Sequence, residues 1–166
     1  MKFRVKPKII LEFAALLALL FVAEAYLTRD AVRGQAPPIQ AATLDGEAFD
    51  LTGFAGRPAV VHFWATWCRI CALEQGMVER LARSHALVSV AMQSGSDAEV
   101  VAWMAERGVA YPVINDPEGE LARHYGVSAV PSSFVLDRQG RVRFVTRGYT
   151  SGAGMRVRLW LAGWYR

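Results

Sequence analysis

The stretch VVHFWATWCRICALE, residues 60–74, decides the fold. Its first part, residues 60–65, is a short run rich in β-branched and aromatic residues, which predicts a strand buried on both faces. From Cys68 onward apolar residues recur at spacings of three and four, which predicts a helix that begins at or beside this cysteine. These apolar residues are Ile70, Leu73, Met77, Val78 and Leu81.

Cys68 and Cys71 form a Cys-x-x-Cys pair at this junction. The first turn of a helix has backbone N–H groups without intrahelical partners and carries about half a positive charge, so it favours a thiolate. We therefore expect Cys68 to be the nucleophile. Cys71 lies one turn deeper on the same helix face and is expected to be the less exposed, resolving thiol. The pair is then able to cycle between a dithiol and a redox-active Cys68–Cys71 disulfide.

Other uses of a Cys-x-x-Cys pair fit this sequence less well. A structural zinc site needs four ligands, and the only other candidates are His62, His85 and His124. Covalent haem attachment needs a histidine directly after the second cysteine, where this chain has Ala72. A purely structural disulfide across three residues removes little chain entropy and stabilises little. We therefore expect neither a metal nor a cofactor.

A second motif, YGVSAVP at residues 125–131, follows the cysteines. Together with FWATWCRIC at residues 63–71, it resembles the thioredoxin superfamily. The closest resemblance is to the membrane-tethered TlpA-like branch, which includes cytochrome c maturation thioredoxins and ScsD-type (suppressor of copper sensitivity) proteins. The resemblance covers about residues 37–166 and implies an α/β fold, a mixed sheet flanked by helices.

The resemblance also implies how a substrate docks. It makes Val130–Pro131 a cis peptide bond that faces the cysteines, although an isolated proline here reads equally as an ordinary turn residue. An incoming extended peptide then pairs with the backbone of Val130 beside Cys68, as in strand addition. Trp67 is assigned to the rim of the site, where an aromatic ring contacts substrate.

Two side chains are candidates for proton transfer, because Cys71 must lose its proton before it attacks a mixed disulfide. Glu74 matches a glutamate that parts of the TlpA-like branch use near the cysteines. His62 stands where cytosolic thioredoxins carry a buried acid. The alternative for Glu74 is a solvated helix acid, and the alternative for His62 is a hydrogen-bonded core histidine. Arg69 either stabilises the thiolate or is simply solvated, so the direction of electron flow stays open.

The N-terminal part of the chain has the charge pattern of a membrane segment. Four of the residues in 1–8 are basic and precede a mostly apolar run, residues 9–27, which as a helix of ~1.5 Å per residue nearly spans a bilayer core. We expect residues 9–27 to be a transmembrane signal anchor, with residues 1–8 cytoplasmic and the cysteines outside. A cleaved signal peptide is the alternative, because residues 23–25 follow a small-x-small pattern. The net charge of +4 is thus largely a topological signal and predicts no nucleic-acid partner.

The remaining chain alternates between strand and helix patterns. Residues 28–38 read as a linker, and residues 39–166 as one thioredoxin-like domain that opens with a β-hairpin around Asp45-Gly46. A capping box at Ser96 and Glu99 opens a helix that resembles the TlpA-type insertion. Further strands are expected at 86–92, 111–114, 133–136 and 142–146, and helices at 120–125 and 155–164.

These observations predict a thiol-disulfide oxidoreductase tethered to the outer (periplasmic) side of the bacterial cytoplasmic (inner) membrane. Its expected partners are a protein thiol or disulfide substrate and, by resemblance, a membrane electron-transfer protein that resets the cysteines. The resemblance allows two substrate classes, apocytochrome c cysteines and thiols damaged under copper or oxidative stress. The resemblance to ScsD-type proteins, which extends to residues 148–162, favours the second. A Cu(I)-delivery module remains an alternative, since two thiolates suit that ion. A peroxidase would need a threonine where Ala65 stands, and an inert scaffold would leave the thiols unreactive.

Overall fold

The computed structural model describes residues 15, 18–19, 22 and 29–165. Within those residues, no helix has both the length and the apolar character that crossing a bilayer requires. The expected cytoplasmic segment, residues 1–8, and nearly all of the expected anchor, residues 9–27, lie outside the described residues. The fold and the site below therefore belong to residues 29–165.

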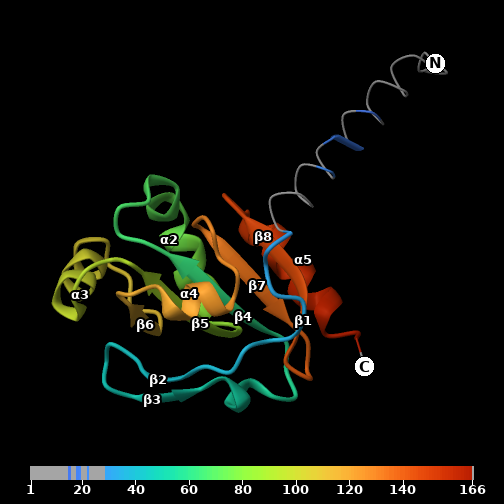
Figure 1. Ribbon diagram of the computed structural model, residues 1–166, viewed down its shortest axis with the longest axis horizontal. Helices are drawn as coiled ribbons and strands as arrows, with labels where there is room; N and C mark the ends of the chain where they lie inside the picture. The colour runs from blue at the N-terminus through green and yellow to red at the C-terminus, as the bar shows by residue number, and fades with distance from the viewer. Residues whose placement is uncertain (1–14, 16–17, 20–21, 23–28, 166) are drawn as a thin grey trace.

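A six-stranded mixed sheet forms the centre of the fold, in the order β1-β8-β7-β4-β5-β6, and a two-stranded hairpin, β2-β3, stands apart from it (Figure 1). Strand β4 is the continuous apolar run, and all six of its residues are buried. It pairs in parallel with β5 and antiparallel with β7. The strands are β1 (Gly34–Gln35), β2 (Gln40–Ala42), β3 (Ala48–Asp50), β4 (Ala59–Trp64), β5 (Ala86–Met92), β6 (Val113–Asp116), β7 (Ser132–Leu136) and β8 (Arg141–Arg147).

Helices and loops cover both faces of this sheet. One face packs against α2, α3 and α5 and includes Val60 and Trp64 of β4. The other packs against α4 and the segment before β2, and includes Val61 and Phe63. This alternation along β4 is the side-chain period of a strand. The helices are η1 (Leu51–Phe54), α2 (Arg69–Ala82), α3 (Asp97–Glu106), α4 (Glu120–His124) and α5 (Gly152–Ala162).

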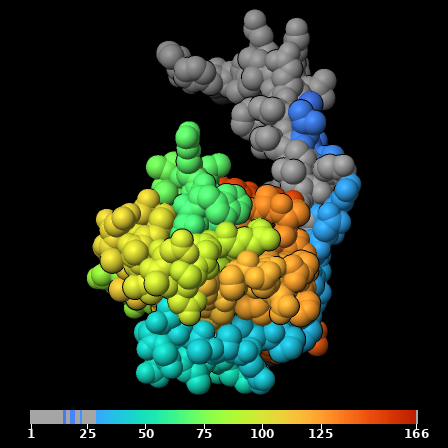
Figure 2. All heavy atoms as spheres, turned by 60° about the vertical axis from the view of Figure 1, so that its left-hand side comes forward, coloured from blue at the N-terminus to red at the C-terminus, as the bar shows by residue number. Residues whose placement is uncertain are grey.

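The structure confirms most of the elements that the sequence predicts. Strand β5 occupies the predicted residues, and the Asp45-Gly46 turn joins β2 to β3. Helix α3 begins with the predicted capping box, in which the Ser96 hydroxyl and the Glu99 carboxylate each bond the other's backbone N–H. In Figure 2, the hairpin and the α3 region lie on the surface, below and beside the α2 region.

Two predictions need correction. The segment 28–38 is not a free linker throughout, because β1 pairs with β8 inside it and both Ala31 and Ala36 are buried. Strand β6 is Val113–Asp116 instead of 111–114, because its ladder with β5 continues through Asn115 and Asp116.

Candidate active site

The two cysteines form a disulfide at the junction of β4 and α2, with their Cα atoms 5.2 Å apart. Cys68 is the N-cap residue of α2, and its sulfur accepts a hydrogen bond of 3.1 Å from the backbone N–H of Cys71. Cys68 is 8% exposed and Cys71 is fully buried, as the sequence predicts for an attacking and a resolving sulfur. The helix N-terminus thus presents an N–H group and its positive end to the outer sulfur.

The loop before Cys68 is held by hydrogen bonds to the residues that follow β5. The backbone N–H of Thr66 donates to the Ser94 hydroxyl at 3.1 Å, and the Trp67 indole N–H donates to the Gln93 carbonyl at 2.9 Å. The Trp67 ring is otherwise exposed at the rim of the site. The sequence predicts the place of Trp67 but gives no sign of its partner.

The proline motif lies against the outer sulfur. The Val130–Pro131 peptide bond is cis, as predicted, and the Val130 carbonyl oxygen is 3.6 Å from the Cys68 sulfur. The Pro131 carbonyl accepts a hydrogen bond of 2.8 Å from the backbone N–H of Gly148, which ties the loop to the end of β8. Residues far apart in the sequence thereby form one site.

Glu74 has a buried carboxylate, so the alternative of a solvated helix acid is wrong. It lies three residues after Cys71, on the same face of α2. Its carboxylate accepts a hydrogen bond from the backbone N–H of Thr150, just before α5. Burial raises the pKa of Glu74 to about 7, while the hydrogen bond from Thr150 opposes this shift. Its charge therefore changes in the range where a thiol proton must be accepted.

His62 is part of the core beneath the site. Its Nδ1 lies 2.9 Å from the Ser133 hydroxyl on β7, and Nε2 has no hydrogen-bond partner among the residues that the structure describes. Burial lowers the pKa of His62 to about 4, so the imidazole is neutral at neutral pH. This geometry favours the core-histidine alternative, and Glu74 is the better placed of the two groups to accept a proton near pH 7.

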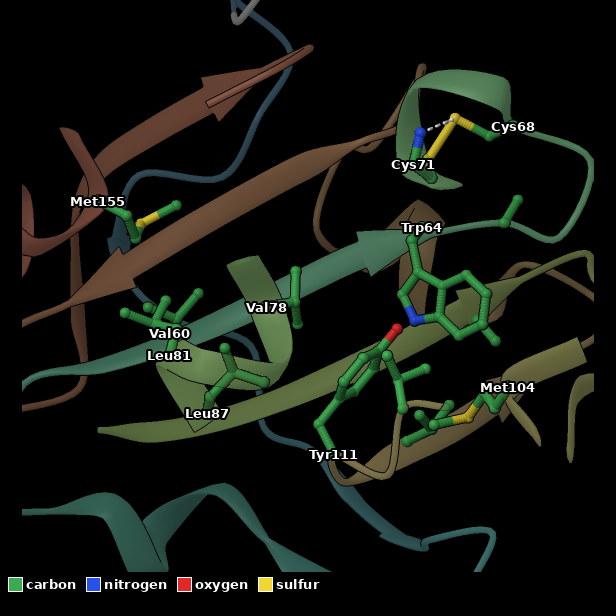
Figure 3. Packing of buried hydrophobic residues seen from close by; sticks show 14 of the residues in the cluster. Val60, Trp64, Cys68, Cys71, Val78, Leu81, Leu87, Met104, Tyr111 and Met155 are labelled. Atoms are coloured by element: carbon green, nitrogen blue, oxygen red, sulfur yellow. Dashed lines mark hydrogen bonds between the residues drawn. A yellow bond between two sulfur atoms is a disulfide. The ribbon is translucent and has the colours of Figure 1, made fainter. Parts of the chain in front are cut away.

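A chain of buried hydrogen bonds, which the sequence does not reveal, supports the helix behind Cys71. The Gln75 side-chain amide donates to the Cys71 carbonyl at 2.9 Å, and the Tyr111 hydroxyl donates to the Gln75 amide oxygen. Burial raises the pKa of Tyr111, so the phenol stays neutral. Figure 3 shows Trp64 and Tyr111 in the core below the disulfide. The Trp64 indole N–H donates to the Ser89 hydroxyl at 3.1 Å.

Exposed apolar side chains lie on the segments that carry the site. They are Trp67 before α2, Ile70 and Leu73 on α2, and Tyr149 next to Thr150. The buried side of α2 near its start carries Glu74 and Gln75 instead. This side therefore holds polar groups around Cys71, and the apolar residues are left at the surface, where a partner protein can contact them.

The described residues contain no group of three or more His, Cys, Asp or Glu side chains arranged to hold a metal ion. The site itself presents two bonded sulfurs that can undergo exchange, with the Glu74 carboxylate on the same face of α2 as Cys71.

Known proteins resemble this chain in sequence and in fold. The family model described as Redoxin matches residues 31–156. A thioredoxin-like protein of Haemophilus influenzae is 30% identical over 142 residues, which cover 84% of each chain. The thiol-disulfide oxidoreductase ResA of Geobacillus thermodenitrificans is 29% identical over 125 residues, 73% of this chain and 72% of the relative. A thiol:disulfide interchange protein of Chlorobium tepidum superimposes with a TM-score of 0.69 at 28% identity, covering 80% of this chain and 98% of that one.

Proposed function

The chain belongs to the Redoxin family and is a thiol-disulfide oxidoreductase, and from that premise we propose that it exchanges disulfides with protein partners outside the cytoplasmic membrane. One observation carries the proposal. The Cys68 sulfur lies at the N-terminus of α2, 3.6 Å from the Val130 carbonyl and beside the exposed apolar rim, whereas Cys71 is buried behind it.

The exchange has two steps. In the reduced enzyme, the Cys68 thiolate attacks a partner disulfide; a bond forms between Cys68 and one partner sulfur, and the other partner sulfur leaves as a thiolate. The Cys71 thiolate then attacks the Cys68 sulfur. The Cys68–Cys71 bond forms, the mixed disulfide breaks, and the first partner sulfur leaves as a thiolate. Two electrons have passed from the enzyme to the partner, and the same steps in reverse oxidise a partner dithiol.

Glu74 is the group that we propose to take the proton from Cys71. A general base is most effective when its pKa lies near the working pH, and burial brings the pKa of Glu74 to about 7. The carboxylate lies on the same helix face as Cys71 and is fixed by the Thr150 N–H. Once Cys71 is deprotonated and has attacked, the proton on Glu74 is released to solvent or to the departing partner thiolate.

Two further parts of the proposal rest on the sequence. The basic residues in 1–8 and the apolar run 9–27 support a tether with the catalytic domain on the periplasmic side. The resemblance to the TlpA-like branch supports a membrane electron-transfer protein that reduces the Cys68–Cys71 disulfide when the enzyme acts as a reductant. Protease protection of the domain in intact cells, lost when the outer membrane is opened, tests the location.

The substrate class separates the two physiological roles. We propose reduction of protein disulfides formed under copper or oxidative stress, supported by the resemblance to ScsD-type proteins. The second candidate is reduction of apocytochrome c cysteines, which fits the same site. Rates with an oxidised Cys-x-x-Cys-His peptide and with a glutathionylated protein distinguish them. Faster reaction with the glutathionylated protein is expected, and faster reaction with the peptide favours the cytochrome role.

Trapping tests the exchange itself. In Cys71→Ser the second step is blocked, so a partner is expected to accumulate as a mixed disulfide on Cys68 that dithiothreitol releases. Cys68→Ser is the matched control, because it keeps one thiol but removes the outer sulfur. Equal capture by both variants, or by neither, contradicts the proposal. Tight Cu(I) binding by the wild-type chain without any insulin reduction would instead favour a metal-delivery module.

A further inference from the structure

The outer side of α5 and the residues after it form an apolar surface that nothing in the described part of the chain covers. Met155 and Leu159 face the core, and helical spacings of three and four place a second apolar stripe on the opposite side. The members of this stripe, with the aromatic residue that follows it, are Val157, Trp160, Leu161, Trp164 and Tyr165, which are 56, 62, 38, 72 and 43% exposed. A helix that is apolar on both sides needs a contact on each.

Positive charge surrounds this stripe. Residues 138–166 contain seven arginines and no acidic residue, whereas residues 29–137 contain eight basic residues against thirteen acidic ones. Four of these arginines lie beside the stripe, because α5 packs along β8 and β7 (Figure 1). Arg156 and Arg158 are on α5, Arg138 is at the turn before β8, and Arg143 lies over the Tyr165 ring while it also pairs with Asp137. Every one of these cations is an arginine, whose planar guanidinium forms paired hydrogen bonds with phosphate.

A hollow lies at the far end of the stripe, between the β7-β8 turn and the end of α5. Its volume is about 610 Å³, and its lining includes Pro58, Arg138, Leu159, Trp160, Trp164 and Tyr165. The Trp160 and Trp164 rings pack edge to face, 5.5 Å apart, and the Arg143 guanidinium lies 4.3 Å over the Tyr165 ring. Indole and phenol rings next to guanidinium groups form the side-chain combination that partitions into the headgroup region of a bilayer.

We propose that this surface, the α5 patch (Val157, Trp160, Leu161, Trp164 and Tyr165 with the surrounding arginines), binds an anionic lipid bilayer. The aromatic and aliphatic side chains enter the headgroup region while the guanidinium groups bind lipid phosphates. A second copy of the chain is disfavoured as the occupant, since a two-fold contact sets Arg138, Arg156 and Arg158 of one copy against the same arginines of the other, and the acidic residue near the patch, Asp137, is buried and already paired with Arg143.

Binding by the α5 patch leaves the catalytic end free. Helix α5 begins beside Thr150, which contacts Glu74, and at ~1.5 Å per residue it carries Trp164 well away from the cysteines. A domain that lies on the bilayer through α5 therefore keeps the Cys68 sulfur open to proteins at the membrane surface. The inference rests on the surface of the domain and does not depend on the proposed thiol chemistry.

Quenching of tryptophan emission by brominated lipid tests this proposal on the full chain. Residues 1–28 contain no tryptophan, so an N-terminal membrane segment gives no signal. The full chain is reconstituted into vesicles of brominated phosphatidylcholine with or without phosphatidylglycerol, and its emission is compared with that in unbrominated lipid. We expect anionic brominated vesicles to remove about two fifths of the emission, since two of the five tryptophans lie in the patch.

Val157→Glu places a carboxylate in the patch but keeps both reporting tryptophans, and Val101→Glu is the matched control on the exposed side of α3. The quenching is expected to fall at least threefold in Val157→Glu, in vesicles without phosphatidylglycerol and at high salt, and to persist in Val101→Glu. Absence of quenching in the wild type, equal quenching in Val157→Glu, or equal quenching in neutral lipid overturns the proposal. So does a dimer in detergent that only Val157→Glu dissociates, since the occupant is then a second copy.

Discussion

Burial of Glu74 and of His62 is expected to give two contributions to the free energy of unfolding whose pH dependences cancel. Burial raises the pKa of Glu74 from 4.5 to about 7 and lowers that of His62 from 6.5 to about 4. Each displacement is worth about 3 kcal/mol at 1.36 kcal/mol per pH unit. Between pH 4.5 and 6.5 the folded state holds a proton on Glu74 that the unfolded chain has lost. In the same interval it lacks the His62 proton that the unfolded chain has bound.

The two contributions therefore have opposite signs. Stability from Glu74 is fully present below pH 4.5 and is lost as the pH rises through about 7. Stability from His62 is fully present above pH 6.5 and is lost as the pH falls through about 4. In the wild type these slopes offset each other. Glu74→Gln is expected to unmask a rise of about 3 kcal/mol from pH 4 to 6.5, and His62→Gln a fall of about 3 kcal/mol from pH 4.5 to 7.

Urea unfolding of the oxidised full chain in mild non-ionic detergent, repeated across pH 4–8, measures these slopes. Glu106→Gln is the control, because it removes an exposed carboxylate on α3 and is expected to leave the wild-type profile unchanged. The double variant at positions 62 and 74 is expected to be flat again. A Glu74→Gln profile parallel to the wild type between pH 4.5 and 6.5 refutes the assignment of a buried, proton-holding carboxylate beside Cys71.

Two further substitutions test the packing that holds the site. Gly126 has φ +66°, and a Cβ added there would lie 1.9 Å from the Asp30 carbonyl oxygen, whereas Gly108 has φ +62° and open space around it. Gly126→Ala is therefore expected to lower the free energy of unfolding by at least about 2 kcal/mol more than Gly108→Ala. Equal losses of stability in the two variants, measured by thermal unfolding, refute the close contact. Burial opposes ionisation of Asp137, but hydrogen bonds to its carboxylate, among them one of 2.6 Å from Arg143, hold its pKa below 3.8. Asp137→Asn is therefore expected to lower the free energy of unfolding by about 2 kcal/mol at pH 7. The wild-type advantage should fade as the pH drops below 3.8, and a difference that stays constant with pH contradicts this role.

The sequence predicts the parts of the site that depend on local pattern. The buried strand, the helix start at Cys68 and the capping box of α3 each follow from a few neighbouring residues. The order of exposure of the two cysteines follows from helix geometry alone. The cis bond at Val130–Pro131 came from resemblance to a family, because a single proline does not specify it.

Contacts between segments that lie far apart in the chain could not be predicted from the sequence. The Glu74 carboxylate accepts a hydrogen bond from the N–H of Thr150, 76 residues away, and the buried Tyr111–Gln75 pair joins residues 36 apart. Apolar spacing on α2 shows that Ile70 and Leu73 share a face with Met77, but it does not show how much of that face is buried. That depends on where β5 and α5 pack against the helix.

The pH dependence of alkylation of each cysteine in the reduced full chain, read by mass spectrometry, tests directly whether Cys68 is activated and Cys71 is protected. Iodoacetamide is expected to modify Cys68 with a midpoint well below the ~8.5 of a free cysteine, and to leave Cys71 almost unmodified until the chain unfolds. Equal modification of both cysteines, or a Cys68 midpoint at the value of a free thiol, contradicts an activated outer sulfur with a buried resolving partner.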